Sequence, residues 1–144
     1  MLVGEYHHSI DPKKRVSIPA KMREELGEEM MIVRSIRGNC LKVFSMAEWN
    51  KYIEPINSLD RKVAEEANRF FYCGAAQGGP DSLGRMLLTE VLLKHIGIDV
   101  NNEEQRNVVL LGCGTYGEIW AESDYCKQTQ DQDDIRRKLE ESGL

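Results

Sequence analysis

Short runs rich in apolar residues recur along the first 45 residues, and Arg15-Val16-Ser17-Ile18 alternates polar and apolar residues, as is typical of a strand with one buried face. The pattern predicts four strands, over residues 2–10, 15–18, 30–35 and 41–44. Pro19 stands at the first turn of a helix expected over residues 20–26, and Gly27 follows it as a C-terminal cap. Ser45-Met46-Ala47-Glu48 is a capping box that opens a second helix.

The same order of elements returns in the second half of the chain. The matches run at an offset of 70 residues and then, beyond a longer loop, at 76; they include Gly4 with Gly74, Asp11 with Asp81, Arg15 with Arg85, and Leu41 with Gly117. A unit of this size buries little surface alone, so two units are expected to face each other. The predicted fold is α+β, with a mostly β core, short helices and a pseudo-twofold relation between residues 1–57 and 74–127.

Two further segments complete the expected organisation. Residues 58–73 are expected to form a connecting helix, whose buried face would be built from Val63, Ala67, Phe70 and Phe71. Residues 128–144 are polar, with Ile135 and Leu139 four positions apart. They predict a marginal helix or a frayed tail, and a helix that docks on a partner is the alternative.

The charge balance narrows the class of protein. The 144 residues carry a formal net charge of −5, which argues against a basic protein that coats nucleic acid. The first 23 residues nevertheless hold five cations against two carboxylates, a local net charge of +3. No apolar run approaches the roughly 20 residues of a membrane span. A cytoplasmic protein that does not act on membranes is expected.

Motifs of the common enzyme classes are missing from the sequence. It contains no G-x-S-x-G, P-loop, G-x-G-x-x-G or H-E-x-x-H pattern, so neither a catalytic site, a cofactor nor a small-molecule substrate is expected. The four cysteines include no C-x-x-C pair, which argues against a zinc site. They are expected to be buried free thiols.

The candidate chemistry lies in two matched turns. Lys13, Lys14 and Arg15 are consecutive cations on a tight turn, where they can reach phosphate oxygens or base edges, although most surface charge runs are merely solvated. Arg85 is the matching cation in the second half. It is a candidate contact because one guanidinium can bind both its own turn and a ligand. The residues expected to shape the turns are Asp11, Pro19, Asp81 and Gly84.

The first of these motifs closely resembles the N-terminal motif of the MraZ family. It runs Gly4-Glu5-Tyr6…Ser9-Ile10-Asp11-x-Lys13-x-Arg15-Val16-x-Ile18-Pro19-Ala20-Lys21…Arg23. The second motif of that family is similar to Gly74-Ala75…Asp81-x-x-Gly84-Arg85 together with Glu118-Ile119-Trp120. The resemblance covers about residues 1–126.

This resemblance implies a fold, a function and a set of partners. It implies two tandem AbrB-like units with swapped-hairpin architecture. It also implies a nucleoid-associated bacterial transcription regulator, usually a repressor, that assembles as a ring homo-oligomer. The implied partner is double-stranded DNA, at direct repeats in the promoter of the division and cell-wall gene cluster. Lys13, Lys14 and Arg15 become the leading DNA contacts, with Arg85 matching them.

Several positions depart from the family's pattern. Lys14 stands where the family usually has Gly, Thr89 replaces a Pro, and Leu93 replaces an Arg. Thr89 and Leu93, together with Gly78-Gly79-Pro80, lead us to expect a more relaxed second turn. The alternative function is an oligomeric protein-interaction scaffold without specific DNA binding.

Overall fold

The computed structural model describes residues 1–128 and 131–144. The first half forms β1 (Leu2–Ser9), β2 (Arg15–Ser17), α1 (Ala20–Leu26), β3 (Met30–Arg34), β4 (Cys40–Ser45), α2 (Met46–Ile53) and the 3-10 helix η1 (Glu54–Ser58). After the connecting helix α3 (Arg61–Tyr72), the second half forms β5 (Ala76–Gly78), β6 (Arg85–Leu87), α4 (Glu90–His95), the 3-10 helix η2 (Glu103–Gln105), β7 (Asn107–Gly114), β8 (Gly117–Ala121) and α5 (Glu122–Gln128). Helix α6 (Gln132–Glu141) follows.

The strands and helices expected from the sequence are present close to their expected bounds. Ser45 caps α2 through a hydrogen bond that its Oγ accepts from the backbone N–H of Glu48, at 3.2 Å. The two 3-10 helices were not expected. Strand β5 is the second half's counterpart of β1, but it is only three residues long and ends in Gly78. Thr129 and Gln130, which belong to the expected tail, lie outside the described residues.

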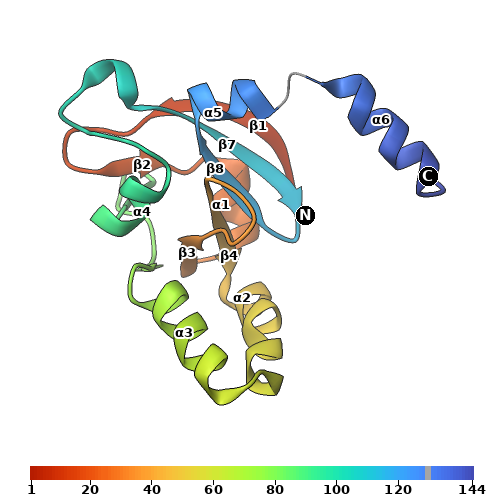
Figure 1. The fold of residues 1–144 in the computed structure, drawn as a ribbon. Coiled ribbons are helices and arrows are strands. Elements are labelled where there is room, and N and C mark those ends of the chain that lie inside the picture. The colour runs from red at the N-terminus through yellow and green to blue at the C-terminus, as the bar shows by residue number, and fades with distance from the viewer. Residues whose placement is uncertain (129–130) are drawn as a thin grey trace.

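The strands form one six-stranded antiparallel sheet and one two-stranded sheet (Figure 1). The order in the large sheet is β1-β7-β8-β4-β3-β5, and β2 pairs with β6. Strand β1 of the first half thus pairs with β7, whereas β5 of the second half pairs with β3. The strand order reads the same from either end when the two halves are exchanged. The sheet is therefore built by both halves together.

The main core lies between the large sheet, the small sheet and the helices α1 and α4. Strand β3 shows how the period of two residues divides the interior. Met30 and Ile32 face the main core, whereas Met31 and Val33 face a second cluster on the opposite side of the sheet. Because β3 is buried on both faces, it reads as a continuous apolar run.

The second cluster is aromatic and lies under α2 and α3. Trp49 is 1% exposed, and its ring centroid lies 5.6 Å from that of Phe44 and 5.7 Å from that of Phe71. The expectation that the apolar face of α3 is buried is wrong in part. Phe71 is buried, but Val63 is 48% exposed, since nothing in the described part of the chain covers that part of the helix.

Candidate nucleic-acid interface

The first turn, over residues 11–15, is held together by one carboxylate. Asp11 Oδ1 accepts hydrogen bonds from the backbone N–H groups of Lys13 and Arg15, both at 2.9 Å. Asp11 Oδ2 accepts a third from Nε of Arg15 at 2.7 Å. The backbone N–H of Lys14 donates to the Asp11 carbonyl at 2.9 Å and closes the turn. Asp11 therefore shapes the turn and orients the Arg15 guanidinium at the same time.

The second turn, over residues 81–85, repeats this arrangement. Asp81 Oδ1 accepts from the backbone N–H groups of Leu83 at 3.0 Å and Arg85 at 2.9 Å, and its Oδ2 accepts from Nε of Arg85 at 2.9 Å. The expectation of a more relaxed second turn is thus wrong. Thr89 stands where the family usually has Pro, and it caps the N-terminus of α4. Its Oγ1 accepts a hydrogen bond from the backbone N–H of Leu92 at 3.2 Å.

The two turns are joined by the small sheet and by reciprocal hydrogen bonds. The backbone N–H of Leu88 donates to the Lys14 carbonyl at 2.8 Å, and that of Ile18 donates to the Gly84 carbonyl at 2.9 Å. Arg85 Nη1 also lies 3.9 Å from Oδ2 of Asp11 in the other turn. The structure thus brings together the two arginines that the sequence placed 70 residues apart.

The two-stranded β2–β6 sheet has one buried and one outward face. Val16 and Met86, paired with each other, are 0% and 4% exposed and point into the core. Because side chains alternate along a strand, Arg15 and Arg85 both lie on the outward face. Arg15 is paired with Leu87, and Arg85 is paired with Ser17. Their side chains are 27% and 26% exposed. Leu87, opposite Arg15, is 64% exposed on the same face.

The fourth position of each turn has a left-handed backbone. Gly84 has φ 80°, and Lys14 has φ 67°, a conformation that costs a non-glycine residue about 1–2 kcal/mol. A Cβ at residue 84 would also lie 2.1 Å from Nη1 of Arg23, so the guanidinium of that side chain would have to shift. The position equivalent to Arg23 in the second half is Leu93, which is buried in the core. The guanidinium next to residue 84 therefore has no counterpart at the equivalent position of the second half.

Hydrogen bonds keep both turn carboxylates ionised. Partial burial acts to raise the pKa of Asp11, but the hydrogen bonds from Arg15 and Lys13 and the guanidinium charge outweigh it, so the pKa lies below its ordinary value. The hydrogen bond from the Arg85 backbone N–H is the largest cause that lowers the pKa of Asp81. Each arginine therefore faces a permanently charged carboxylate at neutral pH.

The remaining expected site residues take different places. Lys13 is exposed, and no described carboxylate lies within ion-pair distance of it. Lys14 forms an ion pair with Glu90 on α4. Pro19 precedes the first turn of α1, and its carbonyl accepts a hydrogen bond from the backbone N–H of Arg23 at 2.9 Å.

The contacts of Arg23 and Glu90 were not predicted from the sequence. Arg23 rests on the second turn although it belongs to the first half, and its Nε is buried without a hydrogen-bond partner in the described part of the chain. Glu90 reaches Lys14 from the other half of the chain. Both contacts cross between halves, so no local sequence signal could have indicated them.

The described part of the chain contains no cluster of side chains suited to bind a metal ion. Among residues 1–128 and 131–144, no group of three or more His, Cys, Asp or Glu side chains could hold a metal ion. All four cysteines are free, but the expectation that they are buried holds fully only for Cys40, since Cys73 and Cys126 are exposed. No described helix is both long and apolar enough to cross a membrane.

Comparison with known proteins identifies the family of this chain. A family model described as "MraZ protein, putative antitoxin-like" matches residues 1–70. The protein named transcriptional regulator MraZ of Caldicellulosiruptor bescii is 36% identical over 150 residues, which cover the whole of both chains. Its namesake in Moorella thermoacetica is 39% identical over 137 residues, covering 92% of this chain and 91% of that one.

Two conclusions follow from these likenesses. The relatives' names describe a regulator and not an enzyme, in agreement with the expectation drawn from the missing catalytic motifs. The likeness extends through both matched turns and far beyond the segment that carries the first motif, so the family resemblance stated from the motifs is confirmed. This chain belongs to the MraZ family.

Proposed function

We propose that this chain is a transcriptional regulator that binds double-stranded DNA, with the outward face of the β2–β6 sheet as the contact surface. The observation that carries the proposal is the pairing of two carboxylate-anchored turns, which hold Arg15 and Arg85 on one two-stranded ribbon. A two-stranded β-ribbon fits the major groove, and arginine is the side chain that most often reads guanine there.

The contacts assign a different role to each cation. Asp11 and Asp81 occupy Nε of their arginines, which leaves the Nη groups to donate to a base edge or a phosphate. Arg15 is the proposed reader of guanine, and Arg85 is its counterpart from the second half. Lys13, which is exposed, is the proposed phosphate ligand, while Lys14 would exchange its exposed partner Glu90 for a phosphate.

The chain is proposed to consist of two AbrB-like, swapped-hairpin units related by a pseudo-twofold axis. The units comprise residues 1–57 and 74–127, joined by residues 58–73 and followed by residues 128–144. The reciprocal pairing of β1 with β7 and of β5 with β3 supports this division, because each unit supplies a strand to the other.

The target is proposed to be a set of direct repeats in the promoter of the division and cell-wall gene cluster, bound by a ring of identical chains at the nucleoid. A ring would present its turns at regular spacing, so that each weak contact gains from the effective concentration set by the first. The acidic remainder of the chain, with a net charge of −8 outside the first 23 residues, would disfavour binding along arbitrary DNA.

The proposal is tested by fluorescence anisotropy with a labelled duplex from the region upstream of the chain's own gene cluster. Arg15→Ala should weaken binding by about tenfold or more, the loss expected for one bidentate base contact. Lys13→Ala should reduce the salt dependence of binding, since one phosphate contact is lost. Arg61→Ala is the matched control, because Arg61 is 93% exposed and lies at the start of α3, outside the β2–β6 sheet.

Two results would overturn the proposal. If Arg15→Ala binds as tightly as the parent and as Arg61→Ala, the ribbon is not the contact surface. If the parent binds no duplex at either of two salt concentrations, the chain fits the alternative of an oligomeric protein-interaction scaffold.

A further inference from the structure

One leucine lies on the outward face of the β2–β6 sheet, among the cations proposed to bind DNA. Leu87 is 64% exposed, whereas its chain neighbours Met86 and Leu88 are 4% and 1% exposed. Because side chains alternate along a strand, the pairing that buries Met86 turns Leu87 outward. Neither hydrophobic cluster of the described chain includes Leu87, so this side chain contributes little to the fold of the monomer.

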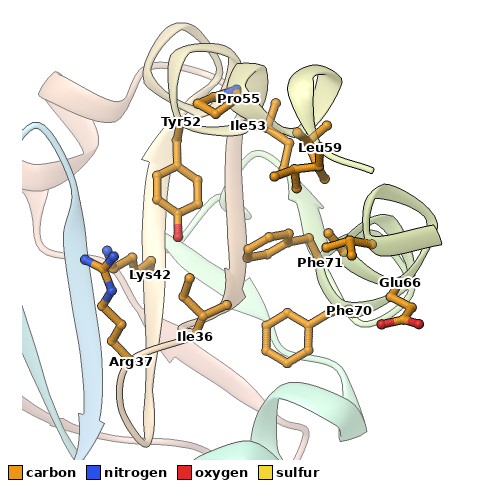
Figure 2. Close-up of a pocket in the computed structure, with 13 residues that line it drawn as sticks. Ile36, Arg37, Lys42, Tyr52, Ile53, Pro55, Leu59, Glu66, Phe70 and Phe71 are labelled. Atoms are coloured by element: carbon orange, nitrogen blue, oxygen red, sulfur yellow. The ribbon is translucent and has the colours of Figure 1, made fainter. Parts of the chain in front are cut away.

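The surroundings of Leu87 set it apart, since a single exposed leucine is common on protein surfaces. Other exposed apolar side chains, such as Ile36 and Leu59, line an apolar groove of about 650 Å³ between α2 and α3 (Figure 2). Leu87 lies apart from this groove, on the face that displays Arg15 and Arg85. It therefore belongs to the proposed DNA-contacting surface.

The register of the two strands places Leu87 directly opposite Arg15. Directly opposite residues on one face of an antiparallel pair have Cβ atoms about 5 Å apart. Neighbouring base pairs of DNA are separated by about 3.4 Å along the helix axis. A ribbon that brings Arg15 to one base pair therefore brings Leu87 within reach of the next one.

The chemistry of the major groove indicates what a leucine can recognise there. Thymine presents its C5 methyl group, whereas guanine presents the acceptors N7 and O6. Leucine forms no hydrogen bond, so a base acceptor that it covered would be left without a partner. Contact with a thymine methyl group removes apolar surface from water on both sides and needs no hydrogen bond. Leucine at this place therefore favours thymine.

The other end of the sheet lacks this leucine. Ser17 is equivalent to Leu87 at the repeat offset of 70, and it lies opposite Arg85. A serine hydroxyl both donates and accepts hydrogen bonds, so it can meet either kind of polar base edge. Arg15 thus has an apolar neighbour and Arg85 has a polar one, and the two ends of the ribbon present different chemistry.

We propose that Leu87 is a specificity-determining residue that contacts the C5 methyl group of a thymine in the base pair next to the guanine read by Arg15. The inference rests on the proposed DNA-binding function and adds to it the identity of a second base. Because Ser17 replaces the leucine beside Arg85, a site read in this way has no twofold symmetry. Each chain then binds its site in one orientation.

The first experiment locates the two bases by fluorescence anisotropy, with a labelled duplex that contains a single repeat of the upstream region. Each guanine is replaced in turn by 7-deazaguanine, which lacks the N7 acceptor, and each thymine by uracil, which lacks the C5 methyl group. The guanine bound by Arg15 is the one whose replacement weakens binding of the parent but not of Arg15→Ala. Replacing the thymine of an adjacent base pair by uracil should weaken binding of the parent about fourfold, the factor expected for one apolar methyl group.

The second experiment asks whether Leu87 is the group that contacts this methyl. Leu87→Ala should bind the thymine and uracil duplexes equally, because the partner of the methyl group is removed. Leu83→Ala is the matched control, since Leu83 is 71% exposed in the second turn, at the position equivalent to Lys13. It should keep the fourfold difference. Both leucines are exposed, so both variants should keep the urea resistance of the parent.

The outcomes separate this proposal from the DNA-binding proposal. If no uracil next to that guanine weakens binding of the parent, or if Leu87→Ala keeps the fourfold difference, Leu87 reads no thymine. The ribbon would remain the contact surface in that case, provided that Arg15→Ala binds weakly. Loss of the difference in Leu83→Ala would assign the methyl contact to the second turn and would likewise overturn the proposal. If Arg15→Ala binds as tightly as the parent, both proposals fail.

Discussion

Replacing Gly84 by Ala should destabilise the chain through two separable effects. The first is conformational, because the backbone at Gly84 has φ 80°, and an alanine held there costs about 1–2 kcal/mol. The second is steric, because the new Cβ would lie 2.1 Å from Nη1 and 2.7 Å from Cζ of Arg23. The whole guanidinium would have to move, at a further cost of about 1 kcal/mol. The total expected loss in the free energy of unfolding is about 2–3 kcal/mol.

Two further variants isolate the steric effect. Gly97→Ala imposes the same kind of backbone cost, since Gly97 has φ 72°, but nothing lies within 4 Å of its Cβ position. It should therefore cost only about 1–2 kcal/mol. In an Arg23→Ala background, Gly84→Ala should fall to that same cost, because the obstructing guanidinium is gone. The difference between the two backgrounds is the coupling energy, about 1 kcal/mol.

The assay is urea denaturation followed by circular dichroism, at one fixed chain concentration so that self-association affects all variants equally. The reasoning would be refuted if Gly84→Ala cost no more than Gly97→Ala, or if its cost were the same with and without Arg23. Either result would mean that Arg23 does not rest on the second turn.

Acid should weaken the two turns, and cysteine reactivity should follow burial. The pKa values of Asp11 and Asp81 are lowered on folding, so their stabilising effect is complete above the ordinary value of 3.8 and is lost as the pH falls toward their folded-state values. Replacing both by Asn should flatten the loss of urea resistance below pH 4, and a slope equal to that of the exposed control Asp133→Asn would contradict this. Burial raises the pKa of Cys40 to about 12, so iodoacetamide at pH 8 should label the exposed cysteines well before Cys40, as peptide mass spectrometry would show; equal labelling would contradict the burial.

Local order is the part of this protein that could be predicted from its sequence. Each turn is built from contacts between residues two to four positions apart, from Asp11 to Lys13 and Arg15, so its signal is contained in a short stretch of sequence. Runs rich in apolar residues likewise predicted the main strands, and the repeat with its offset of 70 predicted that β2 and β6 would be equivalent. These signals are short in range and depend on residue type and spacing alone.

Tertiary structure alone decided which of these parts meet. The contact of the Arg23 guanidinium with Gly84 and the ion pair of Lys14 with Glu90 leave no signal in the local sequence. Each joins segments about 60 or more residues apart. Pairing of β1 with β7 across some 100 residues decided that both halves build one sheet. Val63 illustrates the converse, since its spacing correctly marked an apolar helix face. Whether such a face is buried, however, depends on what the rest of the chain can bring to cover it, and here the described chain covers Phe71 but leaves Val63 exposed.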